Sequence, residues 1–172
     1  MLVFLLPTVL TVGFLLTGAM RRYALARQLM DVPNARSSHQ IPTPRGGGVS
    51  IVLGFLGALL FLFLWEGLPL DQMIALAGGG GVVAVVGFLD DHGHIAARWR
   101  LLAHFGGAGW LLWFLGGVPS YSLFGVLLPA LLWQLLAAFY LVWLLNLYNF
   151  MDGIDGIAGI EALSVCLGGA LV

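Results

Sequence analysis

Long apolar runs separated by short polar segments dominate the sequence. A membrane-spanning helix needs about 20 mostly apolar residues, and several runs approach that length. We expect spans at residues 2–20, 46–65, 73–89, 101–115 and 124–145, and a further one from residue 157 to residue 172. The pattern therefore predicts an all-α fold, a polytopic transmembrane helical bundle with about six spans in a single membrane domain, residues 1–172.

The distribution of positive charge orients these spans. The chain has 7 basic residues, all of them arginine; five lie between the first two spans and the other two follow the third span. Alternating spans put all of them on one side, which the positive-inside rule assigns to the cytoplasm. We therefore expect cytoplasmic segments at about 21–45, 90–100 and 146–156, and an N-terminus outside. Arginines follow the first apolar run and none precedes it, so we interpret it as a retained helix rather than a signal peptide.

The composition excludes several classes of protein. Hydrophobic residues make up 60% of the chain and charged residues only 9%, whereas soluble domains carry about 25% charged residues. This excludes a soluble globular domain, a disordered tail and a basic nucleic-acid-binding surface. A Walker-type phosphate loop is also excluded, because it requires a lysine.

The first polar segment, residues 31–48, reads DVPNARSSHQIPTPRGGG. Its prolines resist helix formation, so we expect a loop. Arg36 and Arg45 offer forked donors that suit phosphate oxygens. Gly46, Gly47 and Gly48 open the next span, where backbone amides suit an anion. The alternative is an ordinary positively charged loop with a glycine hinge.

The second polar segment, residues 90–100, reads DDHGHIAARWR and begins with two adjacent carboxylates. Asp90 and Asp91 repel each other unless a cation lies near, and a helix C-terminus disfavours acidic residues. Mg²⁺ is the natural partner, because it takes oxygen ligands and substrate phosphates. His92 and His94 leave open a transition metal with mixed nitrogen and oxygen ligands.

The third polar segment starts at residue 146 and reads NLYNFMDGIDGIAGIEAL. Its polar residues recur every third position, at Asn146, Asn149, Asp152 and Asp155. A small-residue packing face would explain the interleaved glycines but not the carboxylates and amides. Two further glycine clusters, at 78–81 and 106–109, predict close helix packing in the bilayer. His104 is interpreted as a structural histidine whose hydrogen bonds are satisfied.

Together, the three segments resemble the bacterial polyprenyl-phosphate N-acetylhexosamine-1-phosphate transferases, glycosyltransferase family 4. The family's paired Asp after the third span matches Asp90 and Asp91, and its Asn-x-x-Asn-x-x-Asp-Gly-x-Asp-Gly signature is matched from Asn146 to Gly156. The string PTPRGGG, residues 42–48, is similar to the branch that starts O-antigen and related surface polysaccharides. The peptidoglycan-precursor branch, which transfers phospho-MurNAc-pentapeptide, has a Thr-Met-Gly-Gly form there and a lysine beyond the Asp pair.

This resemblance implies transfer of an N-acetylhexosamine-1-phosphate from a UDP-sugar to undecaprenyl phosphate, with release of UMP. It also implies Mg²⁺ dependence, with Mn²⁺ as an alternative, at the cytoplasmic face of the bacterial inner membrane. The partners it implies are UDP-N-acetylhexosamine, undecaprenyl phosphate and membrane lipid, with a homodimer left open. The implied catalytic residues are Asp90, Asp91, Asp152 and Asp155. The implied substrate-binding residues are Arg36, His39, Arg45, Asn146 and Asn149, and the implied metal ligands are Asp90, Asp91 and Asp152.

Two alternatives to an active transferase are an ion-coupled transporter and an inactive remnant. An ion-coupled transporter would also carry acidic residues, but near the bilayer midplane and often across inverted repeats. Here the acids lie at span ends on one face, and no internal repeat is evident. Members of the family are longer and carry further spans, so we interpret the chain as the N-terminal part of a longer transferase, whose activity on its own is left open.

Overall fold

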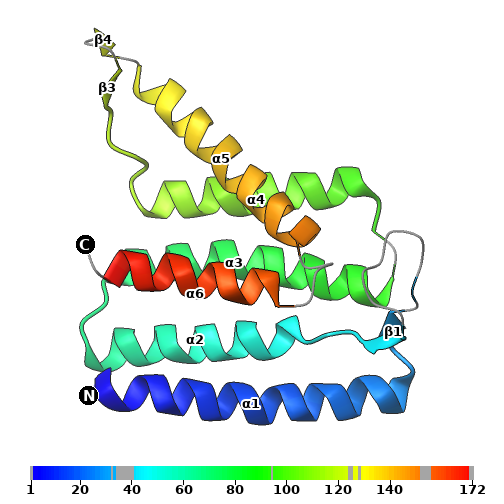
Figure 1. Cartoon of the computed structure of the whole chain (residues 1–172). Helices are drawn as coiled ribbons and strands as arrows, with labels where there is room; N and C mark the ends of the chain where they lie inside the picture. The colour runs from blue at the N-terminus through cyan, green and yellow to red at the C-terminus, as the bar shows by residue number, and fades with distance from the viewer. Residues whose placement is uncertain are drawn as a thin grey trace.

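The computed structural model describes residues 2–31, 33, 41–93, 95–123, 126–127, 129–151 and 156–170. Within these ranges the chain forms helices and two short β-ribbons, joined by turns and loops (Figure 1). The helices are α1 (Leu2–Arg27), α2 (Gly48–Trp65), α3 (Leu70–His92), α4 (Ala97–Phe114), α5 (Ala130–Met151) and α6 (Ile157–Ala170). The strands are β1 (Met30–Asp31), β2 (Thr43–Pro44), β3 (Ser122–Leu123) and β4 (Val126–Leu127).

The length and apolar character of the helices confirm a polytopic membrane protein. Among the described residues, α1, α2, α3 and α5 are long and apolar enough to cross a membrane. Helices α4 and α2 are equally long, at 18 residues each, but α4 carries Arg98 and Arg100 in its first turn. Helix α6 is a shorter apolar helix.

The helices pack in the order in which they occur along the chain. Helices α1 to α4 form a layer in which each contacts the next, and α5 packs on α4 at an angle to that layer (Figure 1). Because consecutive helices run in opposite directions, one end of the layer collects the ends of α1 and α3 and the starts of α2 and α4.

Glycines make the α3–α4 contact close, as the sequence predicts. A Cβ atom added at Gly79 would lie 3.0 Å from the carbonyl oxygen of Gly107, and the reverse substitution would give the same distance. The Trp110 indole packs over Gly78 and donates a hydrogen bond to the Ile74 carbonyl at 3.0 Å. The two backbones thus approach to a distance that only small residues permit.

A hydroxyl pair connects α1 to α2 near the polar end of the layer. Thr17 Oγ1 donates to Ser50 Oγ at 2.8 Å, and Ser50 Oγ donates to the Gly47 carbonyl at 2.6 Å. Ser50 is buried, with only 3% of its surface exposed. The start of α2 is therefore held against α1 by polar contacts as well as by apolar packing.

The chain between α1 and α2 is held by a short antiparallel ribbon. Strand β1 pairs with β2, with Met30 opposite Pro44. The backbone amide of Arg45 also donates to the Leu29 carbonyl at 2.9 Å. These bonds fix Arg45 beside the end of α1, immediately before α2 begins.

Helix α5 occupies a different range from the predicted span 124–145. Residues Val126–Leu127 pair with Ser122–Leu123 as a ribbon, and the helix begins at Ala130, after Pro129. Proline suits the start of a helix, because its missing N–H would have no partner there. The helix then continues to Met151, so Asn146 and Asn149 lie in its last turns rather than in a loop.

Candidate functional site

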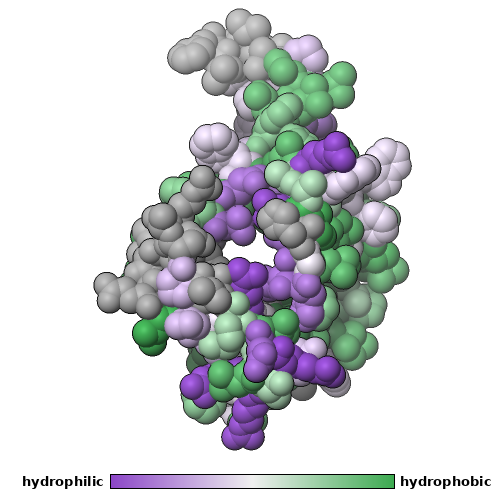
Figure 2. All heavy atoms as spheres, turned by 90° about the vertical axis from the view of Figure 1, so that its right-hand side faces the viewer, coloured by the Kyte–Doolittle hydropathy of each residue, from purple (hydrophilic) through white to green (hydrophobic). Residues whose placement is uncertain are grey.

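Polar residues gather at the end of the layer where α3 ends and α2 begins. Figure 2 shows this end, where hydrophilic residues surround a hollow. Residues at the start of α2 and the end of α3 line an open pocket of about 1190 Å³ at this end. Segments far apart in the sequence, around Arg45, Asp91 and Asn149, all line it. The predicted convergence of polar segments is therefore observed for the residues that the structure describes.

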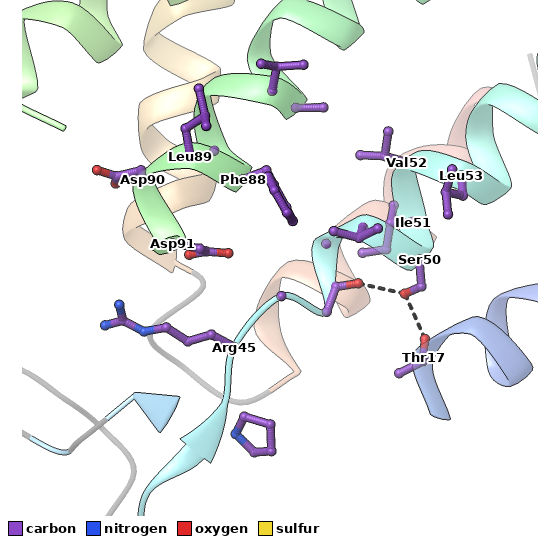
Figure 3. A pocket seen from close by; sticks show the side chains of 18 of the residues that line it. Thr17, Arg45, Ser50, Ile51, Val52, Leu53, Phe88, Leu89, Asp90 and Asp91 are labelled. Atoms are coloured by element: carbon purple, nitrogen blue, oxygen red, sulfur yellow. Dashed lines mark hydrogen bonds between the residues drawn. The ribbon is translucent and has the colours of Figure 1, made fainter. Parts of the chain in front are cut away.

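The pocket has a polar rim and apolar walls. The first two turns of α2 and the last two turns of α3 form the walls, with Ile51 and Phe88 among them (Figure 3). Val85 of α3 lines the pocket as well. Ile51, Val85 and Phe88 are 74%, 58% and 40% exposed, so the walls offer apolar surface to a ligand. Gly46, at φ 91°, turns the chain into α2 at the rim.

Asp90 is held by two hydrogen bonds at the end of α3. Its Oδ2 accepts from Arg100 Nη1 at 2.8 Å, and its Oδ1 accepts from the Ile95 amide at 2.9 Å. The Asp90 side chain is 23% exposed and the Arg100 side chain 36%. Charge-assisted hydrogen bonds of this kind are stronger than neutral ones, so the carboxylate has a fixed orientation.

Asp91 has a different environment from its neighbour. Figure 3 shows the two carboxylates pointing to different sides of the end of α3. Asp91 is exposed and lines the large pocket, and Arg45 reaches the same pocket from the chain just before α2. A carboxylate and a guanidinium therefore lie at one rim, which carries charges of both signs.

A second, smaller pocket of about 150 Å³ lies between α3, α4 and α5. Asp90 and Asn149 line both pockets, whereas Arg100, His104 and Asn146 line only the smaller one. The Nδ1 atom of His104 is buried and has no hydrogen-bond partner among the described residues. The expectation that His104 is a satisfied structural histidine is therefore not met.

Of the other residues that the sequence predicts, some bond to the backbone of their own helix and the rest lie outside the described residues. Asn146 Nδ2 donates to the Val142 carbonyl of its own helix at 2.7 Å. His92 Nδ1 lies 2.9 Å from the Phe88 carbonyl, one turn back along α3. Four predicted site residues and the second histidine of the proposed mixed-ligand site lie outside the described residues: Arg36, His39, Asp152, Asp155 and His94.

Several described residues carry the kind of ligand that Mg²⁺ prefers. Asp90, Asp91 and Asn149 line the large pocket, and the hard oxygen donors of such side chains suit Mg²⁺. Within the described ranges no three His, Cys, Asp or Glu residues form a group that could hold a metal ion. The third predicted ligand, Asp152, lies outside those ranges.

Sequence reasoning assigned no role to Arg100. From the sequence, this arginine is only one of the charges that orient the membrane spans. Asp90 and Arg100 are ten residues apart on different helices, and no spacing rule predicts such a pair. The only sequence signals were their placements, an acid at a helix C-terminus and a base at a helix N-terminus, where each charge is unfavourable.

Known proteins match a large part of this chain. The family described as glycosyl transferase family 4 matches residues 73–172. A probable undecaprenyl-phosphate N-acetylglucosaminyl 1-phosphate transferase of Bacillus subtilis is 27% identical over 92 residues, which cover 54% of this chain and 25% of that protein. A decaprenyl-phosphate N-acetylglucosaminephosphotransferase of Mycobacterium tuberculosis is 31% identical over 102 residues, covering 55% of this chain and 23% of that protein. The matched region thus spans about a quarter of the length of each relative.

Proposed function

The chain belongs to glycosyl transferase family 4, and on this basis we propose that the protein transfers an N-acetylhexosamine-1-phosphate from a UDP-sugar to undecaprenyl phosphate. In the proposed reaction an oxygen of the lipid phosphate bonds to the sugar-bearing phosphorus of the donor. The bond from that phosphorus to the bridging oxygen breaks, and UMP leaves with the bond's electron pair. The products are UMP and a lipid diphosphate sugar.

The observation that carries this proposal is the combination of polar rim and apolar walls in the large pocket. A lipid phosphate is an anion attached to a long apolar chain. Arg45 at the rim offers a cation for the phosphate, and the exposed walls of α2 and α3 offer a surface for the chain. We propose that the pocket binds this acceptor, with its phosphate at the rim.

Phosphoryl transfer depends mainly on alignment and charge neutralisation, and the proposed roles follow from that. Arg36, His39 and Arg45 contact phosphate groups or the donor. Asp152 and Asp155, together with Asn146 and Asn149, orient the pyrophosphate and nucleotide. Asp90, Asp91 and Asp152 hold Mg²⁺, which when bound neutralises negative charge on the phosphates.

The proposed setting is the bacterial inner membrane, with the polar end of the layer facing the cytoplasm. The six arginines within the described ranges all lie in segments near this end, consistent with the positive-inside rule. The proposed pathway is the first membrane step of O-antigen or related surface polysaccharide synthesis. UDP-MurNAc-pentapeptide, the donor of the peptidoglycan-precursor branch, provides the contrast: it should be a poor substrate.

The test uses membranes that contain the protein produced from its complete reading frame. Incorporation of labelled UMP into UDP-GlcNAc should require the protein and lipid-linked product. Asp91→Asn should abolish this exchange, because the substitution removes a charge at the rim. Asp71→Asn is the matched control: it removes a carboxylate from the opposite end of α3, where the side chain is also exposed.

Two results would contradict the proposal. Wild-type membranes that show no UMP-dependent exchange with any UDP-N-acetylhexosamine would refute the activity. Equal exchange by Asp91→Asn and Asp71→Asn would remove Asp91 from the site.

A further inference from the structure

We propose that Arg100 is a positioning residue of the transfer site, which acts by holding the Asp90 carboxylate in the wall between the two pockets. This inference rests on the proposed function, because it concerns the same site.

The contact between Arg100 and Asp90 is direct and partly shielded from water. Arg100 Nη1 lies 2.8 Å from Asp90 Oδ2, and the other carboxylate oxygen accepts from the Ile95 amide at 2.9 Å. The carboxylate is therefore anchored through both oxygens. With 23% of its side chain exposed, Asp90 is screened less by solvent than a surface carboxylate would be.

The placement of the two charges is unfavourable for the helices that carry them. Asp90 lies in the last turn of α3 and Arg100 in the first turn of α4. The helix dipole disfavours a negative charge at a C-terminus and a positive charge at an N-terminus. The pairing offsets a penalty that an apolar residue at either position would avoid, so local helix stability does not explain why these residues are present.

The pockets show how Arg100 can act. Asp90 lines both pockets, Asp91 lines only the large one, and Arg100 lines only the small one. Arg100 thus contacts Asp90 from the side away from the proposed acceptor. It neutralises one member of an adjacent acid pair, which reduces the repulsion on the other. Because it does not border the large pocket, we expect it to affect the reaction rate through Asp90 rather than substrate binding.

The first test measures formation of lipid-linked sugar by the full-length protein. Arg100→Gln should lower kcat by about tenfold or more, since it removes a charged hydrogen-bond partner, and should leave the KM for the UDP-sugar unchanged. Arg100→Lys should recover part of the rate. Arg98→Gln is the matched control: it removes the same charge from an exposed side chain two residues away, and kcat should stay within about twofold of wild type.

A double-mutant cycle shows whether Arg100 acts through Asp90. The double variant Asp90→Asn with Arg100→Gln should be no slower than Asp90→Asn alone, because the residue through which Arg100 acts is already changed. If the fold losses in kcat of the two single variants multiplied in the double variant, the inference would be overturned. A changed KM with an unchanged kcat, or an Arg100→Gln variant as active as Arg98→Gln, would overturn it as well.

A second measurement does not depend on activity. Hydrogen exchange at the Ile95 amide reports directly on the Asp90 carboxylate that accepts its hydrogen bond. Arg100→Gln should speed this exchange, and Arg98→Gln should not; equal protection in both would overturn the inference. If the wild-type protein forms no lipid-linked sugar, the proposed function fails, while the exchange data still decide whether Arg100 holds Asp90.

Discussion

The close contact between α3 and α4 yields the sharpest stability prediction. In Gly79→Ala, the new Cβ would lie 3.0 Å from the Gly107 carbonyl oxygen and 3.3 Å from the Leu111 Cβ. The first distance is about 0.4 Å short of the 3.4 Å at which ordinary van der Waals contact begins. Neither neighbour can rotate away, because one is backbone and the other is attached directly to it. The helices must therefore separate. We expect the free energy of unfolding to fall by about 1–3 kcal/mol, the usual range for overpacking.

Two glycines on the same helices provide controls. Added Cβ atoms at Gly81 on α3 and Gly106 on α4 would meet nothing within 4 Å in the described part of the chain. Alanine at these positions should not destabilise the protein. Its higher helix propensity should raise the free energy of unfolding by up to about 1 kcal/mol. The comparison therefore separates the crowding of one contact from the general effect of replacing glycine.

Reversible unfolding in mixed detergent micelles, followed by circular dichroism, measures these free energies. The expected order of stability is Gly106→Ala and Gly81→Ala at or above wild type, and Gly79→Ala below it. If Gly79→Ala were as stable as Gly81→Ala, the two backbones could not be packed as closely as described. The assignment of the glycine clusters to helix packing would then be wrong.

Three further outcomes are expected. Thr17→Val removes the 2.8 Å hydrogen bond to Ser50 with little change of shape and should lower the free energy of unfolding by about 1 kcal/mol, measured in the same micelles. Gln134→Leu removes two hydrogen bonds to the Val118 backbone, at 3.2 Å and 3.1 Å, and should make the β3–β4 region more sensitive to limited proteolysis; unchanged cleavage would contradict this. Chelation with EDTA should stop sugar-phosphate transfer and added Mg²⁺ should restore it; transfer that persists in EDTA would rule out the proposed metal requirement.

The sequence predicted the fold class well, because apolar run length and glycine spacing report directly on membrane helices. The clusters around Gly79 and Gly107 occur where α3 and α4 meet. Helix ends were predicted less well, because hydropathy marks where charge begins rather than where backbone hydrogen bonds end. Helix α3 extends beyond its predicted end, through Asp90 and Asp91 to His92, and the Gly93 amide still donates to the Leu89 carbonyl at 2.8 Å.

The candidate site, too, could be predicted only in part from the sequence. The shared end of the helical layer followed from charge distribution, and it brings Arg45, Asp91 and Asn149 to one pocket. The pairing of Asp90 with Arg100 depends on the angle and separation of two helices, which no local pattern encodes. Hydropathy alone predicts that the span 124–145 starts as membrane helix, although residues 126–127 form a strand before Pro129. Hydropathy does not distinguish the two, because strands and helices can be equally apolar.

Packing in chain order has a consequence for how the protein is made. Each of α2, α3, α4 and α5 contacts the helix synthesised immediately before it, so most contacts join segments close in sequence. Low contact order favours rapid formation of such pairs. The layer can therefore assemble one hairpin at a time while the ribosome is still translating, and the acceptor pocket takes shape as its last described wall, the end of α5, is added.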